Sequence, residues 1–341
     1  MNEFKDRRIF ITGVCGAVGG EMLRQVLDHQ PARVVGIDNN ESALFFKTEK
    51  YRNNSRVRLF IGDVRDGDAL FHHMIDTDIV LHTAALKHVI LCEGSPADAV
   101  RTNIMGVQNI INAALSTGAS KVLFTSSDKA VNPTNVMGTT KLMGERLLTA
   151  ANTLSRGDGP IFFSSRFGNI LGSSGSVVPL FKKQIAEGGP VTVTDREMTR
   201  FIMTLRQAVR LTFESVGLAR GGEVFITKMP VAKIIDLAEI MIEELAEACG
   251  HDPKKIEIKI IGAKAGEKMY EELLSEEERR RTVEMENYFV VKPAFQDVYK
   301  NIEYKYAGVI KDYADKVYNS SVEPKLAKEE LRELLIANNV L

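Results

Sequence analysis

The chain has 341 residues, which is long for one minimal domain and short for three. Its 44 lysines and arginines nearly balance its 45 aspartates and glutamates, so no overall field favours a nucleic acid or an anionic membrane. We therefore expect neither as a partner, and an anionic ligand must be held by local features. The hydrophobic fraction of 44% is ordinary for a packed globular protein.

The cysteines and the N-terminal residues indicate the compartment. Cys15, Cys92 and Cys249 are too widely spaced for a disulfide framework or a paired metal site, and we predict no metal. The first residues lead directly into a strand without the apolar core of a signal peptide, and no run approaches the ~18 apolar residues of a membrane span. These features predict a cytoplasmic protein that does not enter the membrane.

Short apolar runs alternate with helical patterns through the first half of the chain. Most of these runs are continuously hydrophobic, as expected for parallel strands that are covered on both faces. The predicted strands are Arg8–Thr12, Arg33–Asp38, Val57–Ile61, Ile79–His82, Lys121–Thr125 and Ile161–Arg166. The repeated strand–helix units predict an α/β fold, a Rossmann-like doubly wound parallel sheet with right-handed crossovers.

The pattern loosens after about Phe167. The predicted elements beyond it include a short strand at 191–194, an amphipathic helix at 234–248 and a half-exposed strand at 256–261. We predict a dinucleotide-binding domain at 1–167, which elements near 201–228 rejoin, and an interleaved, smaller α+β substrate lobe at 168–341. The charged run Glu276–Arg281 is predicted to be a solvated helix end.

A glycine motif follows the first predicted strand directly and opens a helix. Gly13, Gly16 and Gly19 allow a tight turn and close backbone approach, so a pyrophosphate can sit on the helix N-terminus, where N–H groups and the dipole favour anions. Asp38 ends the second strand, 19 residues after Gly19, which suits a carboxylate that bonds the adenosine ribose hydroxyls. The pattern predicts a dinucleotide cofactor; the alternative is a turn whose glycines serve packing alone.

The residues around Asp38 favour NAD over NADP, because a 2′-phosphate would meet like charge and no arginine lies nearby in the sequence. Asp63 is predicted either to hold the adenine edge or to cap a helix. We interpret Cys15, inside the glycine loop, as a small packing residue rather than a redox thiol. The predicted cofactor-binding residues are Gly13, Gly16, Ala17, Val18, Gly19, Asp38, Asn39, Asp63, Val64, Ala84, Ala85 and Lys141.

Candidate catalytic residues follow the fifth predicted strand. Ser126–Lys129 emerge at its carboxyl end, the edge at which open α/β sheets bind ligands. Met137 and Lys141 are four residues apart and so project from one face of a helix. Short-chain dehydrogenases normally have Tyr-x-x-x-Lys here, and the thioether of Met137 cannot do the acid–base work of a phenol. Lys141 would bond the nicotinamide ribose; the alternatives are a solvated lysine at 141 and a simple ion pair at 128 and 129.

The chain resembles the UDP-N-acetylglucosamine 4,6-dehydratases, the polysaccharide-biosynthesis branch of the extended short-chain dehydrogenases/reductases, over nearly its whole length. The segments that carry the resemblance are 84–89, 126–138, 166–169, 172–179, 199–203 and 266–273. Members of this family have tyrosine or methionine at position 137, and this chain is of the methionine type. By this resemblance we expect a form without the membrane-spanning half of the longest members.

The resemblance implies conversion of UDP-N-acetylglucosamine to its 4-keto-6-deoxy form with tightly held NAD, for surface glycan or nonulosonic acid biosynthesis. Hydride leaves C4, water is lost across C5–C6, and hydride returns to C6. Asp128 would protonate the departing C6 hydroxyl, Lys129 would abstract the C5 proton, and Ser127 would bond the C4 oxygen. Because Met137 cannot deprotonate the C4 hydroxyl, our hypothesis is that Asp128, positioned by Lys141, is first base and then acid. Burial and the nearby Lys141 charge must then favour the neutral form of Lys129.

The resemblance also implies where the substrate binds. Arg200 would hold the diphosphate, since its planar fork suits phosphate, with Asn169 as a second donor; a surface position is the alternative for Arg200. The predicted substrate-binding residues are Lys87 and His88 at the sugar, Val178, Thr192 and Thr194 at the uracil, and Asn169, Arg200 and Glu267. Lys264 and Ala265 replace the arginine–proline that the family has before this glutamate.

Two other functions share the fold: a sugar-nucleotide epimerase, and a non-catalytic NAD-binding protein. Epimerases normally keep the tyrosine and have no acid–amine pair after the serine. The resemblance further implies retention at C5, uracil rather than guanine as the base, and a homodimer or higher homo-oligomer. The pairing helices would lie around Pro96–Leu115 and Val136–Leu154.

Overall fold

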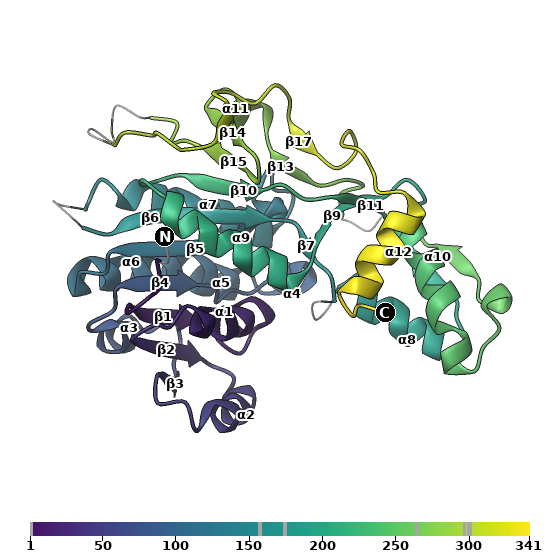
Figure 1. Ribbon diagram of the computed structural model, residues 1–341, viewed down its shortest axis with the longest axis horizontal. Coiled ribbons are helices and arrows are strands. Elements are labelled where there is room, and N and C mark those ends of the chain that lie inside the picture. Colours follow the sequence, from purple (N-terminus) through teal and green to yellow (C-terminus); the bar gives the residue numbers. More distant parts are fainter. Residues whose placement is uncertain (1–2, 156–158, 173–175, 263–265, 296–297, 299–301) are drawn as a thin grey trace. The chain divides into compact units, whose positions relative to one another are not determined.

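The computed structural model describes residues 3–155, 159–172, 176–262, 266–295, 298 and 302–341. The described chain divides into two compact units, neither of which is continuous in sequence (Figure 1). The first unit comprises Met1–Phe167, Val209–Lys228 and Ser275–Lys316, and the second comprises Gly168–Ala208, Met229–Leu274 and Val317–Leu341.

A large sheet forms the centre of the first unit. Within the described residues its strand order is β16-β14-β15-β10-β6-β5-β4-β1-β2-β3. The strands are β1 (Arg8–Thr12), β2 (Arg33–Asp38), β3 (Val57–Ile61), β4 (Ile79–His82), β5 (Lys121–Ser127), β6 (Ile161–Phe167), β10 (Val224–Thr227), β14 (Thr282–Met285), β15 (Tyr288–Val291) and β16 (Val309–Lys311). From β3 to β10 neighbouring strands pair in parallel, and β15, β14 and β16 continue the sheet antiparallel. The predicted doubly wound α/β fold is confirmed.

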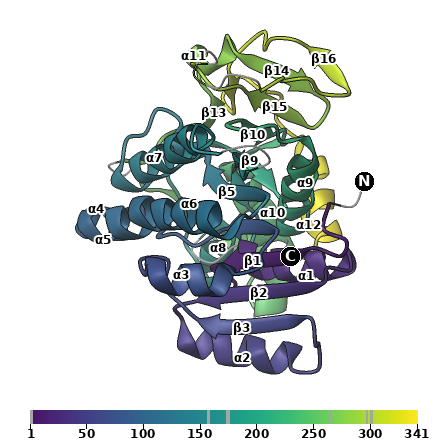
Figure 2. The same ribbon diagram turned by 90° about the vertical axis from the view of Figure 1, so that its left-hand side faces the viewer.

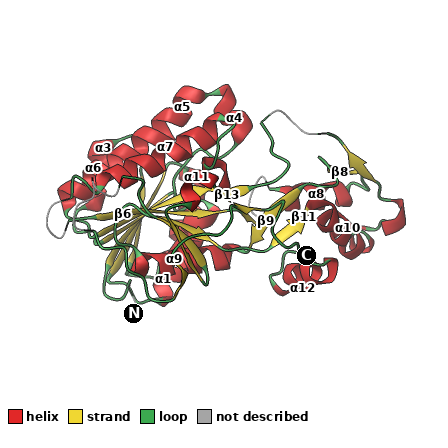
Figure 3. Ribbon diagram, turned by 90° about the horizontal axis from the view of Figure 1, so that it is seen from above, coloured by secondary structure: helices red, strands yellow, loops and turns green. Residues whose placement is uncertain are grey.

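Helices cover both faces of this sheet. Figures 2 and 3 show α3, α6 and α7 along one face and α1 and α9 along the other. The helices of this part of the chain are α1 (Ala17–Asp28), α2 (Glu41–Tyr51), α3 (Gly67–Met74), α4 (Val89–Gly94), α5 (Pro96–Val100), the π-helix η1 (Arg101–Met105), α6 (Gly106–Thr117), the 3-10 helix η2 (Asp128–Ala130), α7 (Val136–Ala151), α9 (Leu205–Leu218) and α11 (Glu276–Arg279). Alternate strand residues such as Phe10, Val80 and Val122 pack against Val107 and Leu148 of α6 and α7, which fixes these helices over the sheet.

The structure differs from the sequence prediction in several places. Of the stretch near 201–228 that was predicted to rejoin the first domain, only Val209–Lys228 groups with the first unit. The segment Ser275–Lys316, which we placed in the substrate lobe, groups with the first unit because β15 pairs with β10 and β14 pairs with β15. The charged run Glu276–Arg281 is not simply a solvated helix end, because the side chain of Glu278 is buried against Arg166. Neither partner is near the other in sequence, so no local pattern indicates the pairing.

The second unit is a smaller α+β body. Its sheets are β11-β9-β7, β12-β8 and β13-β17 within the described residues. Its elements are β7 (Asn169–Ile170), α8 (Val177–Ala186), β8 (Val191–Val193), β9 (Thr199–Met203), β11 (Val231–Lys233), α10 (Ile234–Leu245), η3 (Glu247–Cys249), η4 (Pro253–Lys255), β12 (Ile258–Ile260), β13 (Glu272–Leu274), β17 (Tyr318–Asn319) and α12 (Lys328–Ala337). Apolar faces of α8, α10 and α12 share one core, which includes Phe181, Met241 and Leu335. Across the described parts of both units, no helix is both long enough and apolar enough to span a membrane.

Candidate functional site

The glycine loop between β1 and α1 has the shape of an anion cradle. Gly13 has a φ of +67°, and a Cβ there would lie 2.9 Å from the backbone of Ala84. A Cβ at Gly19 would collide with the carbonyl oxygen of Gly13. Gly16 is the N-cap of α1 and provides no side-chain cap for the first-turn N–H groups, among which are those of Ala17 and Val18. The loop therefore brings bare backbone and a helix N-terminus together, which suits a pyrophosphate.

Asp38 is held at the end of β2, beside this loop. Its carboxylate accepts hydrogen bonds from the backbone N–H groups of Cys15 and Asn40, each at 2.9 Å. Burial, together with the Asp38 charge, raises the pKa of the Cys15 thiol to about 11, so the thiol stays protonated at neutral pH. This supports packing rather than redox chemistry for Cys15.

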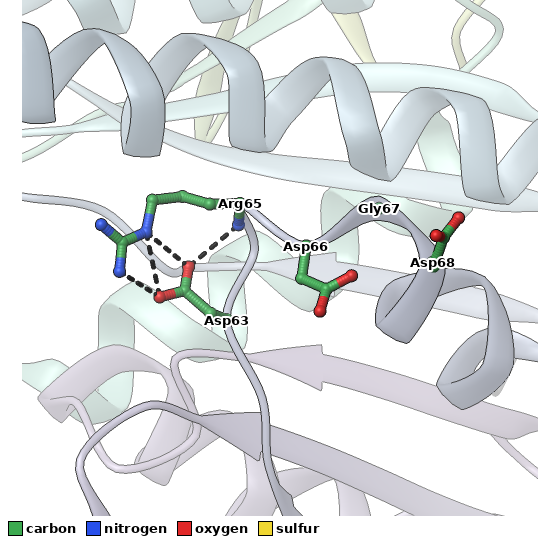
Figure 4. A pocket seen from close by; sticks show the side chains of 5 residues that line it. All are labelled: Asp63, Arg65, Asp66, Gly67 and Asp68. Atoms are coloured by element: carbon green, nitrogen blue, oxygen red, sulfur yellow. Dashed lines mark hydrogen bonds and ion pairs between the residues drawn. The ribbon is translucent and has the colours of Figure 1, made fainter.

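Asp63 lines a surface hollow together with Arg65, Asp66, Gly67 and Asp68 (Figure 4). Its carboxylate accepts bonds from Arg65 Nε at 2.9 and 3.0 Å, and this pairing is the main reason that the pKa of Asp63 is lowered. The side chain of Asn39, a predicted cofactor contact, also bonds Asp63. The cap of α3 is Asp66, which accepts from Ala69 N, so the helix-cap alternative for Asp63 is wrong. Val64 beside it is buried.

The loop after β4 is fastened to the end of β1. Thr12 Oγ1 accepts hydrogen bonds from the N–H groups of Thr83 and Ala84, at 3.1 and 3.2 Å, and lies 2.7 Å from His82 Nδ1. Burial lowers the pKa of His82 to about 3, so the ring is neutral. These bonds hold Ala84 and the following Ala85 beside the glycine loop. Further along, Lys87 and His88 have exposed side chains.

The acid–amine pair lies where β5 ends. The strand was predicted to end at Thr125, but it includes Ser126 and Ser127. The Oγ of Ser127 accepts a hydrogen bond from Lys129 N at 3.1 Å. Asp128 is 6% exposed and Lys129 is 34% exposed at the side chain. Lys129 Nζ lies 3.1 and 3.0 Å from the two carboxylate oxygens of Asp128. The structure therefore places a buried carboxyl and a more accessible amine in direct hydrogen-bond contact.

Lys141 is buried, so the solvated-lysine alternative is wrong. Its Nζ donates to the carbonyl of Thr125 at 3.0 Å and lies 4.5 Å from the centre of the Phe124 ring. Burial lowers the pKa of Lys141 to about 8, against the opposing charge of Glu145. Lys141 is thus poised to change charge near physiological pH.

Met137, one turn before Lys141, is 3% exposed and packs with Cys92 and Ala99 of α4 and α5. The helix begins at Val136, where the N-cap Asn135 accepts from Gly138 N. A Cβ at Gly138 would collide with the carbonyl oxygen of Lys129, so only glycine lets α7 begin this close to η2. Position 137 is therefore part of an apolar cluster.

Two buried polar residues near the site were not predicted from the sequence. Asn103, in the π-helix η1, accepts from Leu86 N and donates to Leu86 O and to Thr140 Oγ1, so it ties α7 to the loop after β4. Glu145 lies one turn beyond Lys141 and is 3% exposed at the side chain. The sequence contained a signal for each of them. Asn103 is an amide inside an apolar helical run, and Glu145 is a carboxylate four residues after Lys141, on the same helix face.

In the second unit, the two predicted diphosphate donors are held by internal partners. Arg200 is 14% exposed, which excludes the surface alternative; it donates to the carbonyls of Thr199, Lys268 and Met269 and pairs with Glu271 Oε1 at 3.4 Å. Asn169 Nδ2 donates to the same oxygen of Glu271. Glu271 was not predicted as a site residue, yet it organises both donors.

Four further predicted substrate residues lie in the same unit. Thr194 Oγ1 donates to the carboxylate of Glu267 at 3.3 Å, and that carboxylate lies 3.8 Å from Arg200. Thr192 bonds Gln184 through both its N–H and its hydroxyl, and Val178 is buried in the core. The motif residues 173–175 and the substituted positions Lys264 and Ala265 lie outside the described residues.

A glycine loop after β1, an acid at the end of β2 and a buried lysine on α7 define the class: a Rossmann-type short-chain dehydrogenase/reductase of the extended kind. The chain belongs to the polysaccharide biosynthesis protein family, whose model matches residues 9–293. The resemblance inferred from its motifs is confirmed by this match and by a solved structure. The X-ray structure of Pen from Bacillus thuringiensis is 42% identical, covers 98% of both chains and superposes with a TM-score of 0.89.

Several relatives match almost the whole chain, among them the three that follow. An uncharacterized membrane protein from Methanocaldococcus jannaschii is 46% identical over 98% of this chain and 96% of its own length. A UDP-N-acetylglucosamine 4,6-dehydratase (inverting) from Campylobacter jejuni is 36% identical, with coverage of 97% and 98%. A UDP-glucose 4-epimerase from Rickettsia bellii is 35% identical, with coverage of 98% and 96%. Of these three relatives, the two with a named activity are thus a dehydratase and an epimerase.

Proposed function

We propose that this chain is a hydro-lyase that converts UDP-N-acetylglucosamine to its 4-keto-6-deoxy derivative with NAD. The observation that carries the proposal is the contact between Asp128 and Lys129 at the carboxyl end of β5. Dehydration needs an acid for the leaving hydroxyl and a base for the C5 proton. A dehydrogenase that only transfers hydride needs one proton acceptor for the substrate hydroxyl, and it needs no further acid or base.

The residues of the first unit fit NAD. The cradle at Gly13 and Gly19 has no room for side chains, and the carboxylate of Asp38 stands beside it for the ribose hydroxyls. Bound NAD supplies the hydride acceptor for C4 and the hydride source for C6. Lys141 would hold the nicotinamide ribose and stabilise negative charge on the C4 oxygen.

Asp128 and Lys129 would divide the proton transfers between them. The carboxylate of Asp128 takes the proton of the C4 hydroxyl, while Ser127 bonds the C4 oxygen. Loss of the negative charge on Asp128 removes the partner that favours the ammonium form of Lys129. The partly exposed ammonium group then releases a proton to water, and the amine becomes available as a base. Neutral Lys129 then removes the C5 proton, which the C4 ketone has made acidic, and Asp128 gives its proton to the departing C6 hydroxyl, which leaves as water. Lys129, now an ammonium ion, donates a proton back to C5 when hydride returns to C6.

Residues of the second unit would bind the nucleotide. Arg200 and Asn169 would donate to the diphosphate, with Glu271 fixing both side chains. Thr192, Thr194 and Val178 would contact the uracil, and Glu267 the nucleotide beside them. In the first unit, the exposed Lys87 and His88 would shape the sugar site.

Incubation with UDP-N-acetylglucosamine in heavy water, followed by NMR, tests this function. We expect a 4-keto-6-deoxy product with deuterium at C5. We propose that the configuration at C5 is retained, as the likeness to the longer methionine-type members implies. The Campylobacter relative is named an inverting enzyme, so both outcomes have a precedent in name or likeness. A product with inverted C5 would contradict our proposal of retention. No conversion at all would refute the proposal.

A sugar-nucleotide epimerase is the second candidate, because relatives from Rickettsia are named UDP-glucose 4-epimerase. It would give a C4 epimer of the substrate with its C6 hydroxyl intact. The absence of a tyrosine at position 137 and the acid–amine pair both favour the dehydratase. A product that retains the C6 hydroxyl would reverse this choice.

We also propose that the chain forms a homo-oligomer through the helices α5, α6 and α7. Apolar side chains are exposed on or beside these helices: Ile90 is 78% exposed, Met105 49% and Met143 47%. Sedimentation of wild type and of Met143→Glu tests this. A monomeric wild-type protein would contradict it.

A further inference from the structure

A buried charge cluster connects β6, α7 and α11 in the first unit. Arg166 Nε and Nη2 donate to the two carboxylate oxygens of Glu145, at 2.9 and 2.6 Å. Its Nη1 and Nη2 donate to the two oxygens of Glu278, each at 3.0 Å. The side chains of Arg166, Glu145 and Glu278 are 0%, 3% and 7% exposed. One guanidinium therefore holds two carboxylates in fixed bidentate geometry, away from water.

This cluster has an unbalanced charge. Two carboxylates face one guanidinium, which leaves a net charge of −1 among the three groups. Buried ion pairs contribute little net stability, because desolvation offsets most of their attraction, so stability alone is a poor reason for this arrangement. Burial opposes ionisation of Glu278, but the Arg166 charge outweighs it and lowers the pKa of Glu278 to about 2.

The negative charge of this cluster acts electrostatically on Lys141. Glu145 lies four residues after Lys141 on α7, so the two side chains are neighbours on one face of the helix. Both are buried, where charges interact strongly. Lys141 has a backbone carbonyl and an aromatic ring as its direct contacts, neither of which has a full charge.

We propose that Glu145 is a positioning residue for the reaction: held in place by Arg166 and Glu278, it keeps Lys141 positively charged inside the protein. The inference rests on the proposed role of Lys141 beside the C4 oxygen. Lys141 can stabilise negative charge there only as an ammonium ion, and burial alone drives it toward the neutral amine. The cluster offsets that tendency without contacting the substrate.

The other titratable groups packed around α7 do not replace this effect. His82 on β4 is neutral above a pH of about 3. Asp128 on η2 is paired with Lys129 at 3.0 Å, so the two charges largely cancel at a distance. Cys92 of α4 is a buried thiol whose pKa is raised by burial. Glu93, also on α4, accepts from Val136 N at the exposed start of the helix.

The cluster also gives the late segment of the chain a part in the site. Glu278 belongs to the capping box of α11, where Ser275 Oγ accepts from Glu278 N and the Glu278 carboxylate accepts from Ser275 N. The start of α11 therefore fixes the side chain of Glu278. Arg166 binds both Glu278 and Glu145, and Glu145 in turn acts on Lys141. Residues more than a hundred positions apart thus set one charge.

A direct titration of Lys141 tests the proposal. Protein labelled with carbon-13 at lysine Cε is followed by NMR against pH, and the Lys141 signal is the one that disappears in Lys141→Met. For wild type we expect a midpoint near 8. Two unit charges about 6 Å apart at an effective dielectric of about 20 interact by roughly two pKa units, so Glu145→Gln should lower the midpoint to roughly 6.

Two variants separate this role from simple structural support. Glu145→Asp keeps the charge and should hold the midpoint within about half a unit of wild type, whereas Glu278→Gln removes the more distant carboxylate and should lower it by about half to one unit. A purely structural role would reduce thermal stability and leave every midpoint unchanged, which would overturn the proposal. Should Glu145→Gln fail to fold, Glu278→Gln decides: no fall in its midpoint refutes the inference.

The same variants distinguish failure of this inference from failure of the proposed function. In the dehydratase assay, the alkaline fall in turnover should move to lower pH in Glu145→Gln, in step with the NMR midpoint. If wild type shows no turnover but the midpoints move as expected, the electrostatic role stands and the proposed function fails. If turnover is present and Glu145→Gln shows the wild-type pH profile and midpoint, the inference fails alone.

Discussion

Replacement of Asp128 by asparagine is the sharpest test of the proposed chemistry. The amide keeps the size of the side chain but can neither accept the C4 hydroxyl proton nor return one to the C6 hydroxyl. Because general acid–base catalysis by one group typically contributes about 10²–10⁴-fold, and Asp128 would act twice, we expect overall turnover to fall at least about 10⁴-fold. The first step, hydride loss from C4, should fall by about 10²–10⁴-fold.

The structure predicts that this loss is chemical rather than structural. Lys129 is 34% exposed, so the ion pair with Asp128 is partly screened by water, and its loss should change the free energy of unfolding by less than about 1 kcal/mol. The hydrogen bond from Lys129 N to Ser127 Oγ, which shapes η2, does not involve the Asp128 carboxylate. Thermal unfolding of Asp128→Asn should therefore resemble that of wild type.

Stopped-flow absorbance of the reduced nicotinamide, after addition of the sugar nucleotide, resolves the first step from the rest. Asp128→Asn should show little reduction, whereas the matched variant Lys129→Met should reduce the nicotinamide normally and then release no 4-keto-6-deoxy sugar. Reduction in Asp128→Asn at the wild-type rate would refute the assignment of Asp128 as the first base. Normal product formation by Lys129→Met would remove the basis of the dehydration mechanism.

Three further predictions concern the surroundings of this pair. Gly138→Ala should lower the free energy of unfolding by about 1–3 kcal/mol, because its methyl group meets the carbonyl oxygen of Lys129. Gly94→Ala, whose methyl group enters open space, is the control in the same denaturant titration. Met137→Tyr should fail to raise turnover and should lower the melting temperature, since the phenol must enter a packed apolar cluster; faster turnover would contradict this. The pKa of Lys141 is about 8 in the folded protein and about 10.5 in the unfolded chain, so the unfolded state binds more protons between these pH values. The free energy of unfolding of wild type should therefore rise by about 3 kcal/mol over this pH interval, relative to that of Lys141→Met. If the two proteins show the same dependence of unfolding free energy on pH, this prediction is wrong.

Local pattern was enough to predict the first half of the sheet. The strands β1 to β4 have the predicted bounds, because continuous apolar runs between turn residues leave few alternatives for a parallel strand. The glycine loop and Asp38 were predictable for the same reason: their conformations depend on neighbours within a few residues. Gly13 indeed has a positive φ.

Contacts between distant segments could not be predicted in this way. Glu278 lies in a run of charged residues that is typical of a solvated helix, and only the pairing with Arg166, 112 positions earlier, makes it a core residue. Likewise, Arg200 has the motif context of a phosphate ligand, but the carbonyls of Lys268 and Met269 that occupy its guanidinium come from a loop without secondary structure. Such partners depend on tertiary packing, about which spacing and composition are silent.

The discontinuous make-up of the first unit has a consequence for biosynthesis on the ribosome. When Phe167 has been made, β6 is complete but the strand that will cover its outer edge, β10, begins only at Val224. Until then the nascent polypeptide has a strand that is destined for the core, with unpaired N–H and C=O groups along one side, a site for association with other chains. We expect fragments that end between these two residues to aggregate, and chaperone dependence to be greatest over this interval of translation.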